Sequence, residues 1–202
     1  MKNVIKNTLI LTAITLVAGV LLGLVYEITK EPIALAKEAA KKEAYQQVMS
    51  DADVFEGLEL IKEAIKEVED AAESSGCSIN EVVEAKANGE TVGFVVTTTT
   101  SEGYGGEIQI SVGILTDGTV NGVAILSIGE TAGLGMKATE EEFYGQYAGK
   151  KVEFFNVTKT GVSADNEIDA LSGATITSNA MTKAVNSAVV YYKHALGGSA
   201  NE

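Results

Sequence analysis

The amino-acid sequence predicts an α+β fold, in which a twisted antiparallel sheet is flanked by helices and one transmembrane helix precedes it. Three observations support this class. The chain opens on an uncharged apolar run, two pairs of alternating apolar and polar segments are each joined by a short turn, and helix-like segments lie before and after them. Strands that follow one another through tight turns favour antiparallel pairing, because parallel strands need long crossovers.

The first expected element is a membrane span. Residues 7–26 carry no charge, and as a helix they reach about 30 Å, the thickness of a bilayer core. A cleaved signal peptide is the alternative, since Lys2 and Lys6 precede the run and residues 34–36 read A-L-A. The run is longer than the apolar core of an ordinary signal peptide, which favours a retained anchor. Its short lysine-bearing tail and the acidic body behind it favour a cytoplasmic N-terminus, with the body on the extracytoplasmic side.

Helices are expected between the span and the sheet. Pro32 suits the first turn of a helix, and the Ala-, Lys- and Glu-rich stretch after it predicts a juxtamembrane helix. Residues 57–72 place apolar side chains at steps of three and four, which predicts an amphipathic helix. The chain therefore divides into an anchor (1–30), juxtamembrane and amphipathic helices (31–74) and a ligand-binding domain (75–202).

Two hairpins form the expected sheet. Asn-Gly and Asp-Gly pairs are the residues that tight hairpin turns prefer. Alternation of apolar and polar residues in the strands predicts a sheet with one buried face. The expected strands are 82–87 and 91–99 around Asn88-Gly89, and 107–115 and 120–128 around Asp117-Gly118. A short helix (140–147), a strand (151–157) and a final helix (178–196) complete the prediction.

Composition excludes several functions. All 15 basic residues are Lys, against 28 acidic ones, and the net charge is −13, which argues against a nucleic-acid partner because phosphate backbones need a basic face. The single cysteine, Cys77, and single histidine, His194, exclude an internal disulfide and sites built from several Cys or His ligands. We therefore expect no metal site and no catalytic residue, and redox chemistry would need an organic cofactor.

The candidate binding site precedes the last helix. Residues 172–178 are small and rich in hydroxyl groups. A helix N-terminus receives anions through its unpaired N–H groups and its dipole, so it is the natural phosphate site in a chain without arginine. The alternative is an ordinary helix start, with Thr177 or Ser178 as the cap and Gly173 in a turn.

Two motifs resemble a known family. Ser172-Gly173-Ala174-Thr175, with Asp169 before it and Thr177-Ser178 after it, resembles the attachment motif of the FMN-binding domains of the Rnf and Na⁺-translocating NADH:quinone oxidoreductase complexes. The loop 129–135, G-E-T-A-G-L-G, is similar to a second loop of that family, with Ala132 where proline is common. The length and single span are similar to those of the Rnf G subunit. The resemblance implies FMN bound covalently, as a phosphoester of the Thr175 hydroxyl.

The resemblance also implies which residues surround the cofactor. Around the attachment threonine they are Asp169, Ser172, Gly173, Ala174, Thr177 and Ser178, and in the second loop Glu130, Thr131, Gly133, Leu134 and Gly135. The glycines would allow close backbone approach, Thr177 and Ser178 would donate hydrogen bonds to the phosphate, and Glu130 and Asp169 would orient backbone groups.

The implied function is that of a membrane-anchored electron-transfer subunit in an ion-pumping ferredoxin:NAD⁺ oxidoreductase, with no independent catalysis. Its implied partners are the other membrane subunits, the lipid, and a Mg²⁺-dependent flavin transferase that uses FAD. Thr175 has no His or Cys neighbour in sequence that would activate it, so it would be the transferase's substrate. Two alternatives remain open: a membrane-tethered protein that binds a phosphorylated ligand reversibly, and a stand-alone extracytosolic flavoprotein reductase.

Overall fold

The structure, a computed structural model, describes residues 1–197. The last five residues of the expected 75–202 domain therefore lie outside the described residues. The chain separates into two compact units, residues 1–41 and the part that begins at Lys42, and each is described by itself.

The first unit is helical from Lys2 onward. It forms most of α1 (Lys2–Val48), which has an apolar stretch of mean hydropathy 2.5 and is long enough to cross a membrane, with none of that stretch buried inside the protein. Thr8 and Thr12 donate their hydroxyl hydrogens to the carbonyls four residues earlier, at 3.0 and 2.9 Å. These bonds satisfy polar groups that hydrocarbon would leave without partners.

Pro32 lies inside α1, so the expectation that it begins a second helix was wrong. A proline removes only one backbone donor. The Ala-, Lys- and Glu-rich residues that follow have high helix propensity, and α1 continues through the proline.

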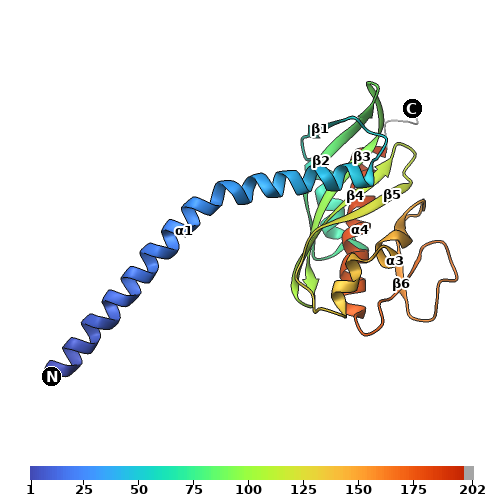
Figure 1. The fold of residues 1–202 in the computed structure, drawn as a ribbon. Coiled ribbons are helices and arrows are strands. Elements are labelled where there is room, and N and C mark those ends of the chain that lie inside the picture. The colour runs from blue at the N-terminus through green and yellow to red at the C-terminus, as the bar shows by residue number, and fades with distance from the viewer. Residues whose placement is uncertain (198–202) are drawn as a thin grey trace. The chain divides into compact units, whose positions relative to one another are not determined.

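The second unit is built on a five-stranded antiparallel sheet in the order β1-β2-β3-β4-β5 (Figure 1), which confirms the expected fold class. Its strands are β1 (Val54–Leu58), β2 (Cys77–Ala87), β3 (Glu90–Gly103), β4 (Gly106–Leu115) and β5 (Val120–Ile128). The β2–β3 turn is the predicted Asn88-Gly89, where both residues have positive φ, 53° and 83°, as this class of hairpin turn requires.

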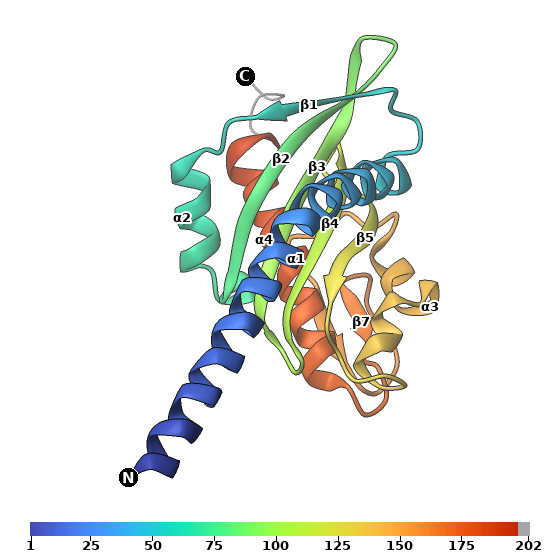
Figure 2. The ribbon, with the colours of Figure 1, turned by 60° about the vertical axis from the view of Figure 1, so that its left-hand side comes forward.

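Both faces of the sheet are covered, although the sequence predicted one buried face. Val82 and Val96 face the larger core with α4 (Thr175–Ala195), whereas Val83 and Val95 face a second cluster with Tyr45 at the end of α1. Figure 2 shows the end of α1 on one side of the strands and α4 on the other. Neighbouring residues of a strand point to opposite faces, so the continuous valine pairs of β2 and β3 fill both layers.

Two local predictions were wrong. The expected helix 57–72 is interrupted: its first residues belong to β1, where Leu58 pairs with Val82, and α2 covers only Lys62–Asp70, followed by the 3₁₀ turn η1 (Ala72–Ser74). The expected strand 151–157 is reduced to β6 (Asn156–Thr158), which pairs in parallel with β7 (Glu167–Asp169). In both places the conformation depends on pairing with another strand, and the local sequence pattern carries no information about that partner.

The short helix near residue 140 exists as α3 (Glu141–Tyr144) with the 3₁₀ turns η2 (Gly135–Thr139) and η3 (Gly145–Tyr147) on either side. Tyr147 of η3 is fully buried and its hydroxyl lies 2.8 Å from that of Thr182 on α4. This contact fixes the segment that follows the second loop against the helix that carries Thr175.

Asn186 on α4 holds the irregular segment before β6. Its Oδ1 accepts the Phe155 N–H at 2.7 Å, and its Nδ2 donates to the Phe155 and Glu73 carbonyls at 3.0 and 3.3 Å. Asn186→Leu should lower the free energy of unfolding by about 2–4 kcal/mol, because it leaves the buried backbone groups of Phe155 without partners.

Guanidinium unfolding of the detergent-solubilised chain, followed by circular dichroism, measures this loss. The exposed Asn179 on the same helix is the control, and Asn179→Leu should change the same free energy by less than about 0.5 kcal/mol. Equal unfolding midpoints for the two variants would contradict the stabilising role of the Asn186 hydrogen bonds.

Candidate functional site

Three segments far apart in the sequence form one cavity of about 510 Å³. They are the β3–β4 turn, the loop after β5 and the first turn of α4. This size is within the range of small-molecule sites. Its walls are Tyr104, Glu130, Thr131, Leu134, Gly135, Gly173, Ala174, Thr175, Ile176 and Thr177.

The N-terminus of α4 opens into this cavity. The helix begins at Thr175, three residues earlier than expected, and its N-cap is Ala174, which makes no side-chain capping bond. The alternative in which Thr177 or Ser178 caps the helix is therefore wrong. The N–H groups of a helix's first turn have no partner within the helix, and here residues 175–177 present theirs beside the cavity.

Ser178 has a different role from the one expected. Its side chain is fully buried, and its Oγ accepts the Leu171 N–H and donates to the Ala174 carbonyl, both at 3.0 Å. The hydroxyl hydrogen is thus committed inside the protein and not available to a phosphate. Ser178 instead holds the turn before the helix, in which Gly173 has a φ of 77° that only glycine adopts without strain.

Glu130 holds two of the three segments together. Its carboxylate is buried, with 8% of the residue exposed, and Oε1 accepts the Gly105 N–H at 3.2 Å. Glu130 therefore orients a backbone group of the β3–β4 turn. A Cβ on Gly135 would lie 2.6 Å from Glu130 Oε2 and 2.6 Å from Thr177 Oγ1, so glycine at 135 lets the loop meet α4.

The loop itself is a tight turn. The N–H groups of Leu134 and Met136 both donate to the Thr131 carbonyl, at 3.1 Å, and Gly133 has a φ of 76°. Leu134 projects toward the attachment motif, because a Cβ on Gly173 would lie 3.2 Å from Leu134 Cδ2. The turn thereby brings Thr131 and Leu134 to the cavity wall, while Gly133 shapes the turn and does not line the cavity.

Asp169 and Ser172 lie outside this cavity. They line a neighbouring hollow of about 390 Å³, together with acidic residues of the α3 segment. The expectation that Asp169 orients backbone through its side chain is not met: the Asp169 N–H donates to Gln146 Oε1 at 2.7 Å, so it is the backbone of Asp169 that is held. The structure thus gathers most of the expected site residues and separates these two.

Sequence reasoning missed Tyr104 and Ile176 as wall residues. Tyr104 lies in a Gly-Tyr-Gly-Gly run, and a lone aromatic residue between glycines is a detectable pattern, because glycine-rich turns display their one side chain. Ile176 interrupts a polar run at a helix start and is 54% exposed. In both cases the pattern is a large side chain that is exposed to solvent instead of packed in the core.

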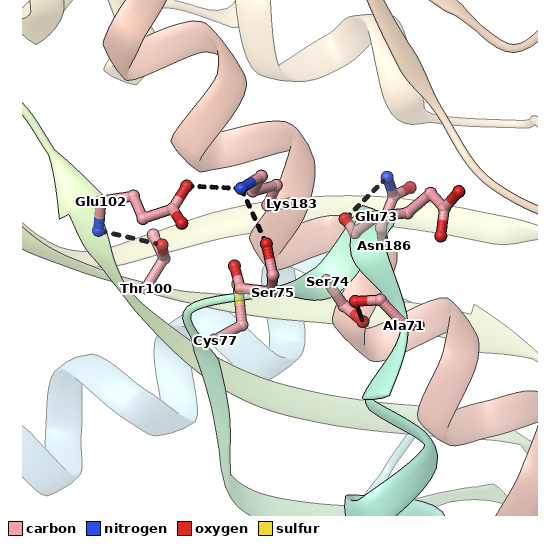
Figure 3. Close-up of polar contacts among 9 residues, drawn as sticks. All are labelled: Ala71, Glu73, Ser74, Ser75, Cys77, Thr100, Glu102, Lys183 and Asn186. Atoms are coloured by element: carbon pink, nitrogen blue, oxygen red, sulfur yellow. Dashed lines mark hydrogen bonds and ion pairs between the residues drawn. The ribbon is translucent and has the colours of Figure 1, made fainter. Parts of the chain in front are cut away.

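Cys77 lies away from this cavity, between η1, the end of β3 and α4 (Figure 3). Burial raises the pKa of its thiol above the ordinary 9.0, although a Thr100 hydrogen bond opposes the shift. Because the folded chain disfavours the thiolate, this group lowers stability as the pH rises through and above 9.0.

Alkylation of Cys77 by iodoacetamide at pH 8 should accordingly be at least about tenfold slower in the native chain than in guanidinium, since burial withholds the thiolate and blocks the reagent. Mass spectrometry of timed samples measures the rate. Equal native and denatured rates would show that the thiol is accessible.

Comparisons with known proteins agree with this geometry. Residues 103–190 match the FMN-binding domain family, and residues 1–48 match the RnfG N-terminal region. The chain is 36% identical over 200 residues to the G subunit of the Na⁺-translocating ferredoxin:NAD⁺ oxidoreductase complex of Acetobacterium woodii, covering 96% of this chain and 93% of that one. It is 33% identical over 189 residues to the G subunit of the proton-translocating complex of Clostridium ljungdahlii, covering 93% and 91%.

A solved structure is also similar. The crystal structure of Shewanella oneidensis NqrC matches with a TM-score of 0.50 and 25% identity, over 56% of this chain and 57% of that one. The FMN-binding match spans all three segments of the cavity, and the RnfG match covers the whole of α1. The chain therefore belongs to the RnfG family, with an N-terminal RnfG region followed by an FMN-binding domain.

Proposed function

We propose that this chain is the membrane-anchored, FMN-carrying G subunit of an ion-translocating ferredoxin:NAD⁺ oxidoreductase complex, and that FMN is bound as a phosphoester of Thr175. The observation that carries the proposal is the uncapped start of α4: Thr175 occupies the first helical position and lines the cavity that the three segments form. Family membership supplies the class of complex.

The residues present fit this cofactor. Unpaired N–H groups and the dipole of α4 favour an anion at Thr175, Gly173 allows close approach, and Leu134 and Ile176 offer apolar walls to a flat ring. FMN, when bound, accepts and releases electrons one or two at a time. The chain's own part is to hold the cofactor, shield it and set its surroundings.

The charges of the cavity favour a covalent attachment. Within the described part of the chain, its wall residues include the buried Glu130 and no Lys. A free phosphate monoester carries about two negative charges at neutral pH, as phosphorylated side chains do, whereas a diester carries one. The partial positive charge at a helix start is about half an elementary charge. It balances a diester better than a monoester, and an ester bond keeps the cofactor in place without a basic residue.

Attachment needs a separate enzyme. Thr175 is partly exposed, so an external transferase can reach it. The Thr175 oxygen would bond to the FMN-side phosphorus of FAD, the anhydride bond would break, AMP would leave and the hydroxyl proton would pass to the medium. The chain supplies the hydroxyl group, and the Mg²⁺-dependent transferase supplies the activation.

The proposed setting is a membrane complex. We place the N-terminus in the cytoplasm and residues from Lys42 onward on the extracytoplasmic side, where a tether keeps the cofactor from being diluted away. Other membrane subunits would pass electrons to and from the flavin, and we assign the binding of NAD⁺ and ferredoxin to those subunits.

Purification of the chain from its own host tests the proposal. The expected product copurifies with multispan subunits, has a visible flavin spectrum that dithionite bleaches, and yields a Thr175 peptide whose mass is increased by FMN less water. If acid precipitation releases the flavin from the chain, the attachment is not covalent, and the result would support the alternative in which the chain binds a phosphorylated ligand reversibly. If the flavin is covalent but the chain copurifies with no membrane subunits, the result would support the alternative of a stand-alone flavoprotein reductase.

A further inference from the structure

Exposed apolar side chains converge on the cavity. Tyr104, Leu134 and Ile176 are 72, 44 and 54% exposed, and all three line it. Large apolar side chains gathered around one concave site mark the binding of an apolar partner surface. A phosphate explains the helix start but not these three residues, so they require a ligand with an extended apolar part.

Tyr104 differs from the other two. It is the only aromatic wall residue of the cavity, as far as the described chain shows, and it comes from the β3–β4 turn, whereas the other two come from the second loop and the start of α4. Aromatic side chains prefer stacked or edge-on contact with other aromatic rings. A tyrosine that water surrounds in the absence of a ligand is therefore placed to cover a flat ring.

The turn that carries Tyr104 is held from one side by the second loop. The Gly105 N–H donates to the buried Glu130, and a Cβ on Gly105 would lie 2.2 Å from the Gly129 carbonyl oxygen. The two backbones are therefore in direct contact. A side chain on so tightly held a turn has its Cα fixed relative to Thr131 and Leu134.

The end of β3 that leads into this turn is held by α4. Lys183 Nζ lies 2.7 Å from Glu102 Oε2 and donates to Ser75 Oγ at 2.9 Å (Figure 3). The Glu102 N–H donates to Thr100 Oγ1 at 3.3 Å. Glu102 precedes Tyr104 by two residues, and Lys183 lies on the helix that begins at Thr175, so this ion pair links the two sides of the cavity.

We propose that Tyr104 packs against the flavin ring that Thr175 carries, and that the Glu102–Lys183 ion pair positions it. The inference rests on the proposed function, because it needs a flavin in this cavity. Tyr104 screens the ring from solvent, and its phenol quenches the excited flavin by donating an electron that the flavin returns. Glu102 and Lys183 act through the turn and touch no cofactor atom.

Time-resolved flavin fluorescence on the flavinylated full chain tests Tyr104. The wild-type chain should show a short-lifetime component and weak quenching by iodide. Tyr104→Leu should lose the short component and admit iodide. Tyr104→Phe should also lose the short component, because phenylalanine does not donate an electron, but should keep the iodide protection, because the ring remains. Tyr144→Leu, which removes a tyrosine outside the cavity wall, should leave both readouts unchanged.

The ion pair has its own matched pair of variants. Lys183→Met should reduce the amplitude of the short-lifetime component without removing it, because Tyr104 is present but less well positioned. Lys193→Met is the control. Lys193 lies on the same helix but outside the cavity wall, and it pairs with Glu153 at 3.4 Å. Equal effects of the two lysine variants would overturn the positioning role.

The outcomes separate this inference from the proposed function. A wild-type chain without attached flavin overturns both. Attached flavin whose lifetimes and iodide quenching are the same in wild type, Tyr104→Leu and Tyr104→Phe overturns the role of Tyr104 and leaves the attachment intact. Should Tyr104→Leu lose its flavin, the Tyr104→Phe lifetimes decide the result by themselves.

Discussion

Thr175→Ala should yield a chain with no covalently bound flavin, whereas the wild-type chain, coexpressed with a flavin transferase, should fluoresce in a denaturing gel. The alanine lacks the only oxygen that the proposed ester uses. Thr175 is partly exposed at the first position of α4, and alanine has high helix propensity. The variant should therefore fold with its melting temperature nearly unchanged.

Two further variants sharpen this result. Thr175→Ser keeps a hydroxyl and should retain attachment at the same or a reduced level. Thr139→Ala removes an exposed threonine outside the cavity wall and should be flavinylated like the wild type. Fluorescence of Thr175→Ala equal to that of the wild type would place the ester elsewhere, and peptide mass spectrometry would show where.

Gly105→Ala should disturb the cavity without touching any residue of the attachment motif. The added Cβ would lie 2.2 Å from the Gly129 carbonyl oxygen and 2.8 Å from its carbon. These are backbone atoms that cannot rotate away, so the β3–β4 turn and the second loop must separate. We expect a loss of about 1–3 kcal/mol in the free energy of unfolding, as for overpacked sites, and a lower yield of flavinylated chain.

Gly129→Ala is the matched control, because it places a methyl group on the other side of the same contact. There the nearest atom is the Gly105 carbonyl oxygen at 3.5 Å, an ordinary van der Waals distance. Thermal unfolding and in-gel flavin fluorescence of the two variants, compared side by side, measure the difference. Equal behaviour would show that the two loops do not need their close approach.

The site could be predicted in part from local chemistry. The hydroxyl-rich run before a helix indicated an anion site, and the Gly133-Leu134-Gly135 loop was expected beside it. The described residues place Thr175 and Leu134 on one cavity wall. Ser178 was assigned to the wrong partner, because the sequence does not show that the Leu171 N–H needs an acceptor. Tyr104 was missed because its contact with the cavity depends on how a hairpin meets another loop.

The fold shows the same division. Asn88-Gly89 determines its turn by itself, because both residues adopt positive φ readily, and Gly118 supplies the positive φ in the turn between β4 and β5. The helix expected over 57–72 failed at its start, where Leu58 pairs with Val82 in the sheet.

The sequence by itself determined the apolar N-terminal helix, the antiparallel hairpins and the hydroxyl-bearing helix start, since each follows from the periodicity or the backbone freedom of neighbouring residues. Only the tertiary structure decided that Glu130 joins the β3–β4 turn to the second loop, that Lys183 joins the same hairpin to α4, and that Tyr104 therefore faces the cavity of Thr175. The physical reason is range: turns and helix starts are set over a few residues, whereas a cavity wall is set by contacts between segments that only packing brings together.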